Sequence, residues 1–215
     1  MSSTDVAQRK AEWEEGVKKF LEVAASTDGW AESHEKLGVQ VHRKDTDAIA
    51  IIKGVGVIKA KPEAVVEICA SLEQRPRWDT FFEGGKLLEV LEEPNNLAFG
   101  HGWTKGGMGV WPRDVALLLG QRPLTAEEGG GYVLYGQSIN GVVEEDTSKF
   151  VRATVHMSGF IIRPLPDNAE HSSVTYIFQI DGAGWLPSSI TNLGYTYQPL
   201  GIIGLRKILT GSPQP

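Results

Sequence analysis

Residues 173–209 read SVTYIFQIDGAGWLPSSITNLGYTYQPLGIIGLRKIL, and this stretch contains both kinds of element from which the fold is built. From Val174 to Ile180 every second residue is apolar, and this period of two predicts a strand with one buried face. In 187–209 the apolar residues recur at every third or fourth position, which predicts a long amphipathic helix. A strand that leads into such a C-terminal helix indicates a sheet that the helix covers.

Upstream of this stretch, strand patterns alternate with two further helices. Helices are expected at 5–25, where Asp5 can cap the first turn, and at 62–73, where Pro62 fits the first turn without losing a hydrogen bond. Runs rich in β-branched residues predict strands at 30–44, 48–59, 86–92, 97–104, 115–122, 132–139, 150–163 and 173–181. Short links between the last six strands predict an antiparallel meander, so the fold class is α+β with a curved sheet around a helix. Residues 5–209 are expected to form one domain, followed by a flexible tail at 210–215.

Composition narrows the functional classes. The 215 residues carry a net charge of −6 and no basic run, so nucleic acid is not expected as a partner. The single cysteine, Cys69, lies in an apolar helical run and is expected to be reduced and buried. The chain shows neither a secretory apolar segment near Met1 nor a membrane-spanning run, which predicts a soluble cytoplasmic protein. The histidines lack metal-ligand spacing and the glycine-rich pieces match no nucleotide-binding pattern, so neither a metal nor a cofactor is expected.

Three motifs occur in order along the chain: Arg75-Pro76-Arg77-Trp78-Asp79, Trp111-Pro112-Arg113-Asp114-Val115 and Asp181-Gly182-Ala183-Gly184-Trp185-Leu186-Pro187. As an ordered set, over residues 10–209, they resemble the START family, the steroidogenic-acute-regulatory-protein-related lipid-transfer domains. The resemblance implies a helix-grip fold, in which a curved antiparallel sheet surrounds a hydrophobic tunnel closed by a long C-terminal helix. It also implies a monomeric, non-enzymatic carrier that binds one phospholipid, sterol or related lipid and touches membrane surfaces transiently.

The residues that would line such a tunnel come from the alternating strand faces, from the final helix and from the motifs. The loop 104–111 is rich in glycine and has apolar tips, so it is expected to act as a gate or a membrane-touching loop. The expected lipid-binding residues are Arg75, Trp78, Asp79, Trp103, Met108, Trp111, Val115, Leu117, Leu119, Val155, Met157, Phe178, Ile190, Leu193, Tyr197 and Leu205.

Arg75 and Asp79 have the spacing at which phosphatidylcholine-binding members place an arginine against the lipid phosphate. A guanidinium inside an apolar tunnel needs an anionic partner, but Asp79 itself could serve, in which case the pair only fixes the turn. By the same resemblance, Val115 stands where choline-binding members have an aromatic residue. Leu119 and Gly102 stand where a cholesterol-binding subset has an arginine and its acidic partner. The resemblance therefore leaves the lipid class open.

Two alternatives to a carrier remain at this stage. A helix-grip enzyme, of the aromatase/cyclase or hydrolase type, would need His101 or His156 as its base. A regulatory lipid-sensing or scaffold module would hold a structural lipid or none, and lipid exchange between vesicles distinguishes this module from a carrier.

Overall fold

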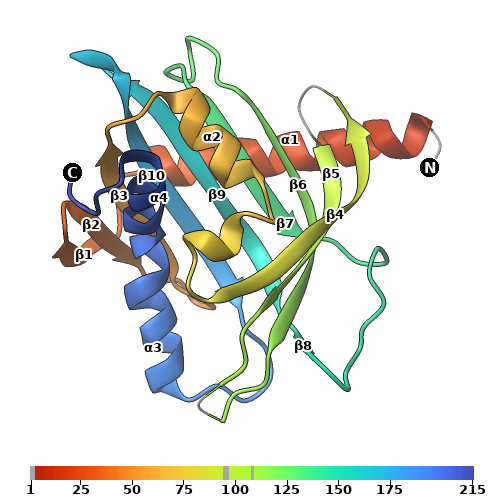
Figure 1. The fold of residues 1–215 in the computed structure, drawn as a ribbon. Coiled ribbons are helices and arrows are strands. Elements are labelled where there is room, and N and C mark those ends of the chain that lie inside the picture. The colour runs from red at the N-terminus through yellow and green to blue at the C-terminus, as the bar shows by residue number, and fades with distance from the viewer. Residues whose placement is uncertain (1–2, 94–96, 108) are drawn as a thin grey trace.

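The computed structural model describes residues 3–93, 97–107 and 109–215. Its centre is a ten-stranded sheet that curves around the helices on one face (Figure 1). The strands are β1 (Trp30–Lys36), β2 (Val39–Lys44), β3 (Ile51–Ile58), β4 (Phe82–Glu92), β5 (Leu97–Thr104), β6 (Arg113–Pro123), β7 (Tyr132–Ser138), β8 (Val151–Arg152), β9 (Thr154–Leu165) and β10 (Asn168–Asp181). The helices are α1 (Ser3–Ala25), α2 (Pro62–Ala70), α3 (Ser188–Tyr197) and α4 (Gly201–Thr210), with short 3₁₀ turns at η1 (Arg75–Arg77) and η2 (Gln198–Leu200).

The strand order is β1-β2-β3-β10-β9-β7-β6-β5-β4, and β8 pairs with β6 in parallel. All other neighbouring strands are antiparallel, and the first three strands join the meander where β3 pairs with β10. Strands β1 and β4 form the two edges, so the sheet is curved but open. The predicted α+β class with a curved antiparallel sheet and a C-terminal helix is therefore confirmed.

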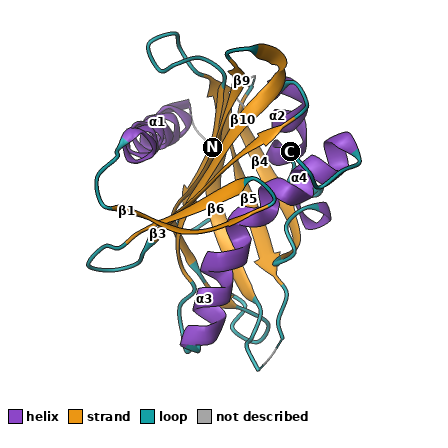
Figure 2. Ribbon diagram, turned by 90° about the vertical axis from the view of Figure 1, so that its left-hand side faces the viewer, coloured by secondary structure: helices purple, strands orange, loops and turns teal. Residues whose placement is uncertain are grey.

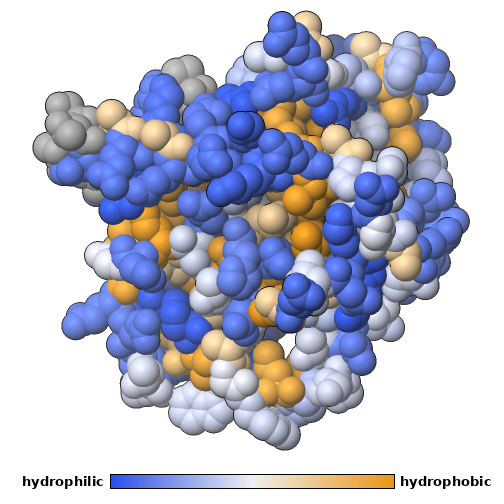
Figure 3. Space-filling view, turned by 180° about the vertical axis from the view of Figure 1, so that it is seen from behind, coloured by the Kyte–Doolittle hydropathy of each residue, from blue (hydrophilic) through white to orange (hydrophobic). Residues whose placement is uncertain are grey.

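Two hydrophobic cores hold helices against opposite faces of this sheet (Figure 2). Helix α1 packs Trp13, Val17 and Phe20 on one face, and all three side chains are at most 2% exposed. Helices α2 and α4 pack on the other face, where Ile202 and Leu205 are fully buried. The face that carries α1 is mainly hydrophilic, and its apolar side chains appear in separate patches below the helix (Figure 3).

The strands expected at 48–59, 86–92, 115–122 and 173–181 are present with bounds that differ by up to five residues, as β3, β4, β6 and β10 show. Four other predicted elements are interrupted or end early. The strand expected at 30–44 is interrupted by a turn at Leu37 and Gly38, which both have positive φ values of 49° and 68°. The strand expected at 150–163 is divided between β8 and β9, because the amide of Ala153 donates to the Asp114 carbonyl of β6. The helix expected at 62–73 ends at Ala70, where the next residue is extended.

The fourth difference concerns the final helix, which is divided into α3, η2 and α4 instead of running unbroken through 187–209. Pro199 lacks an amide hydrogen, so the α-helical bonding cannot continue through it. At this break the chain approaches β3 closely: a Cβ atom added to Gly54 would lie 2.8 Å from the Pro199 side chain. Glycine at position 54 therefore allows the helical turn to lie directly on the sheet.

Candidate functional site

A cavity of about 900 Å³ lies between the concave face of the sheet and α3. Most of the side chains that line it are apolar, and they come mainly from α2, β4, β5, β6, β7, β9, β10 and α3. The loops that follow β5 and β10 lie together at one end of the molecule, the lower end in Figure 1, and both contribute to the lining. This cavity has the size and the apolar lining of a small-molecule binding site.

The structure brings most of the predicted binding residues to this cavity. On β6, Val115, Leu117 and Leu119 alternate toward it, as the period of two predicts. The predicted residues in its lining are Arg75, Asp79, Trp103, Trp111, Val115, Leu117, Leu119, Val155, Phe178, Ile190 and Leu193.

Four predicted residues lie elsewhere. Trp78 and Leu205 are buried in the same core, with Leu205 on α4 and Trp78 packed against that helix. The break at Pro199 turns α4 toward α2 and the sheet, away from the cavity. Met157 packs with the core on the α1 side, because the pairing of β9 with β10 shifts register between Met157 and Val155. Tyr197 is 46% exposed and lies under the Lys36 ammonium group at 5.8 Å. A fifth prediction, Met108, falls outside the described residues.

A cluster of hydrogen-bonded polar groups forms part of the cavity wall. The Arg75 Nε donates to Asp79 Oδ2 at 2.9 Å, and its Nη2 donates to the Tyr176 hydroxyl at 3.4 Å. The Gln198 amide nitrogen donates to the same Asp79 oxygen at 2.7 Å and to the Tyr176 hydroxyl at 3.2 Å. The Tyr176 ring stacks on Phe160 with centroids 4.3 Å apart, so aromatic packing holds the hydroxyl in place.

The electrostatics of this cluster keep its ionic pair intact. Burial disfavours the charge on Arg75, but Tyr176 and Asp79 beside it raise the pKa of the guanidinium above its ordinary value. Burial raises the pKa of the Tyr176 hydroxyl, which therefore stays protonated. Cys69 was expected to be buried in the core, but it is only half-buried and lines the cavity. Burial raises the pKa of its thiol, which disfavours the reactive thiolate.

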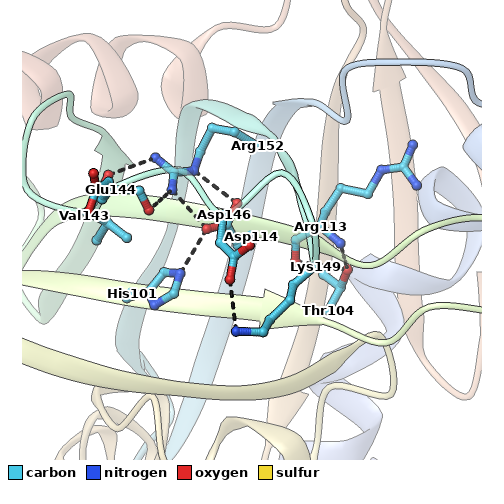
Figure 4. Close-up of polar contacts among 9 residues, drawn as sticks. All are labelled: His101, Thr104, Arg113, Asp114, Val143, Glu144, Asp146, Lys149 and Arg152. Atoms are coloured by element: carbon cyan, nitrogen blue, oxygen red, sulfur yellow. Dashed lines mark hydrogen bonds and ion pairs between the residues drawn. The ribbon is translucent and has the colours of Figure 1, made fainter.

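Two adjacent residues at the start of β6 organise the open end of the cavity. Arg113 lines the cavity and bonds to backbone carbonyl groups, whereas Asp114 points the other way and accepts two hydrogen bonds from Arg152, each 2.9 Å long (Figure 4). His101 Nε2 lies 2.9 Å from Asp114 Oδ2. Burial tends to raise the pKa of Asp114, but the hydrogen bonds from Arg152 and His101 outweigh it and lower that pKa below its ordinary value.

His101 and His156, the two candidate bases, are not among the residues that line the cavity. Among the described residues there is also no group of three or more histidine, cysteine, aspartate or glutamate side chains that could hold a metal ion. No helix in the described part of the chain is long and apolar enough to span a membrane.

Sequence reasoning missed three contributors to the site. Gln198 directly precedes Pro199 in the expected helix, and this position next to the helix-breaking residue was the available signal. Ser158 lines the cavity because the same register shift that turns Met157 away brings the next residue inward. Trp185 is 76% exposed beside the cavity opening, and a tryptophan after a glycine-rich turn could have marked it.

Comparisons with known proteins agree on one family. The family model described as the START domain matches residues 10–209. The chain is 25% identical over 182 residues to the steroidogenic acute regulatory protein, mitochondrial, of Gallus gallus, an alignment that covers 83% of this chain and 63% of the chicken protein. It is 26% identical over 185 residues to StAR-related lipid transfer protein 5 of Bos taurus, covering 81% of this chain and 83% of the bovine one. The solved structure of human StAR-related lipid transfer protein 5 superposes with a TM-score of 0.84 at 19% identity, covering 95% of this chain and 98% of the human one.

Proposed function

The chain belongs to the START domain family, and from this membership together with its cavity we propose that it binds one lipid molecule and transfers it between membranes. The observation that carries the proposal is the apolar cavity of about 900 Å³ between the sheet and α3. Residues 5–209 would act as one lipid-binding domain, without an enzymatic step. We propose that the protein works as a cytoplasmic monomer.

The size of the cavity favours a sterol-sized ligand. Its volume equals that of about 30 water molecules in the liquid, and a methylene group takes up about as much space as a water molecule. A sterol has close to that number of non-hydrogen atoms, whereas a diacyl phospholipid has nearly twice as many. A phospholipid would therefore have to leave part of its chains outside or widen the cavity.

The polar cluster in the cavity wall favours an uncharged headgroup. Arg75 and Asp79 carry opposite charges and bond to each other at 2.9 Å, so together they add no net charge to the cavity. Among the described residues, Arg75 Nη1 donates no hydrogen bond, whereas Nε and Nη2 do. Because Arg75 lines the cavity, its Nη1 hydrogens are left to donate to an oxygen atom of a lipid. A hydroxyl group accepts such a bond without bringing a second anion beside Asp79.

The experiment is lipid extraction and vesicle transfer with the purified protein. We expect mass spectrometry of organic extracts to find one sterol-sized lipid per chain, and we expect dehydroergosterol to move between phosphatidylcholine vesicles in the presence of the protein. Arg75→Met should reduce this transfer at least fivefold. Arg77→Met is the matched control, because Arg77 is exposed in the same 3₁₀ turn and its side chain donates to the neighbouring Gln74. Stoichiometric phospholipid in the extract, or equal loss in both variants, would contradict the proposed headgroup contact.

Contact with membranes would occur at the open end of the cavity. Trp111 and Trp185 are 57% and 76% exposed on the two loops that border this end, and exposed tryptophans partition into membrane interfaces. Trp185→Ser should weaken binding to phosphatidylcholine vesicles in a flotation assay. Unchanged flotation with Trp111→Ser and Trp185→Ser combined would place the membrane contact elsewhere.

A further inference from the structure

The guanidinium group of Arg113 holds two loops together through their backbones. Its Nε donates to the Gly182 carbonyl at 3.1 Å, and its Nη2 donates to the carbonyls of Ala183 and Trp185, each at 3.3 Å. Its Nη1 donates to the carbonyl of Trp111 at 2.5 Å. We call this set of four bonds the Arg113 bridge, and we call residues 109–112 and 182–187 the mouth segments.

The partners of Arg113 in the bridge are all neutral carbonyl groups. Arg113 is 8% exposed, and no ion pair to its side chain is formed within the described ranges. Burial without a carboxylate lowers the pKa of this guanidinium, so burying its charge here is costly. The four carbonyl groups offset that cost, and their positions are therefore strongly constrained by the arginine.

The chain conformation at the bridge depends on this constraint. Ala183 has a φ of 50°, in the left-handed region that residues with a Cβ atom rarely adopt. Such a conformation persists where surrounding contacts impose it. Arg113 donates to the carbonyl before Ala183, that of Gly182, and to the carbonyl of Ala183 itself. These bonds hold the peptide groups on both sides of the Ala183 Cα atom.

Helix α3 begins three residues after Trp185, so the bridge also fixes the start of this helix. None of the residues of α3 is fully buried. The C-terminal end of α3 is held by the bond from Gln198 to Asp79 and by packing of the Arg43 guanidinium on the Tyr195 ring at 5.1 Å. The bridge is thus the attachment at the opposite end of a helix that covers the cavity.

We propose that Arg113 is a positioning residue that couples the two mouth segments, so that they and the N-terminal end of α3 open and close as one unit when lipid enters or leaves. The inference rests on the proposed lipid transfer for its purpose, but the coupling itself is independent of any ligand. Arg113→Lys is the informative change, because lysine keeps the charge but has one compact donor group that cannot reach four separated carbonyls.

The test is hydrogen exchange measured by mass spectrometry on peptides that cover 104–115 and 182–197. In the wild-type protein both peptides should open with the same equilibrium constant across a range of denaturant concentrations. Arg113→Lys should raise exchange at least tenfold in both peptides. It should raise by a similar factor the rate at which dehydroergosterol leaves the protein for phosphatidylcholine vesicles.

Arg206→Lys is the matched control. Arg206 is buried as well, and its hydrogen bonds within the described ranges go to the carbonyls of Val57, Leu37 and Pro213. It is not among the residues that line the cavity. This variant should lower thermal stability without raising exchange in either mouth peptide.

Two results would overturn the coupling: increased exchange in only one of the two peptides, or an equal increase with Arg206→Lys. Increased exchange in both peptides with unchanged lipid release would overturn the role of this coupled opening in lipid passage. If Arg113→Lys fails to fold, different opening constants for the two peptides in the wild-type protein overturn the proposal, and equal ones support it. Absence of any lipid transfer by the wild-type protein would refute the proposed function while leaving the exchange result for the bridge to stand.

Discussion

Two glycines in the C-terminal helical region should respond to alanine in opposite ways. Gly194 of α3 lines the cavity, and a Cβ atom built on it would have no neighbour within 4 Å. Gly204 of α4 is packed on Trp78, where the same atom would lie 2.5 Å from the Trp78 carbonyl oxygen and 2.9 Å from its Cα atom. The first glycine therefore leaves empty space, whereas the second is required for close approach of two backbones.

The magnitudes follow from helix propensity and packing. Gly194→Ala should stabilise α3 by about 1 kcal/mol, the usual difference between the two residues inside a helix. If α3 opens locally before the sheet unfolds, this change slows its hydrogen exchange about fivefold. Gly204→Ala gains the same propensity but forces α4 away from Trp78, and overpacking of this kind costs about 1–3 kcal/mol. Its net effect should be destabilising, and each kcal/mol lost should lower the melting temperature by about 2–4 °C for a chain of this size.

Thermal unfolding and hydrogen exchange of both variants provide the measurement, with vesicle-to-vesicle transfer of dehydroergosterol as the functional assay. If opening of α3 limits transfer, Gly194→Ala should slow transfer by about the same fivefold factor as exchange. If Gly194→Ala destabilised the protein, the conclusion that the space beside this glycine is empty would be wrong. Slower exchange with unchanged transfer would refute the idea that lipid passes under α3.

Further predictions concern the cavity, the acid response and the thiol. Leu119→Trp should fill part of the cavity and reduce bound dehydroergosterol several-fold, whereas Leu88→Trp, on an exposed edge-strand residue, should not. Hydrogen bonds lower the pKa of Asp114, and those from Arg122 lower the pKa of Glu128 to about 2. Below pH 4.5 the unfolded chain therefore binds more protons than the folded chain does. The urea concentration at the midpoint of unfolding should fall as the pH is lowered from 4.5 toward 2, and a midpoint that stays constant would contradict this. Cys69 should react slowly with a disulfide reagent at pH 7, because burial raises the pKa of its thiol. A bound sterol should slow the reaction further, because Cys69 lines the cavity, and a fast reaction would contradict the raised pKa.

Strand periodicity predicted the cavity lining where the strands are regular and failed where a register shift intervenes. On β6 the pairing with β5 and β7 is continuous, so the alternation of Val115, Leu117 and Leu119 in the sequence survives in the structure. On β9 one extra residue stands between the partners of Gln179 and Ile180, and every position from Met157 onward changes face. Neither a glycine nor a proline marks this site in the sequence, so local composition contains no signal for it.

The C-terminal region shows a second limit of sequence reasoning. The apolar spacing of 187–209 predicted a helical cover correctly, and Pro199 predicted a weak point in it. Which apolar residues face the cavity depends on how far the chain rotates at η2, and this rotation follows from tertiary packing of Pro199 on Gly54. Ile190 and Leu193, before the break, line the cavity as predicted, whereas Leu205 after it lies in the core. Of the motif residues, Arg75, Asp79 and Trp111 line the cavity, whereas Trp78 lies in the core.

Arg113 and Asp114 are charged, yet they occupy the first two positions of the mostly buried strand β6. Each of them can do so because it has its own hydrogen-bond partners. Successive side chains of a strand point to opposite faces, so one residue reaches the mouth segments while the other reaches Arg152 and His101 (Figure 4). Arg152 in turn donates to the carbonyls of Val143 and Glu144, which attaches the loop before β8 to the same point. Segments on both sides of the sheet thus depend on the start of β6 for their positions. A shift of this strand by one residue would exchange the two faces and place the Asp114 carboxylate against the carbonyl groups that Arg113 now binds. Because a carboxylate repels carbonyl oxygens, the order of the two charges fits the two surroundings.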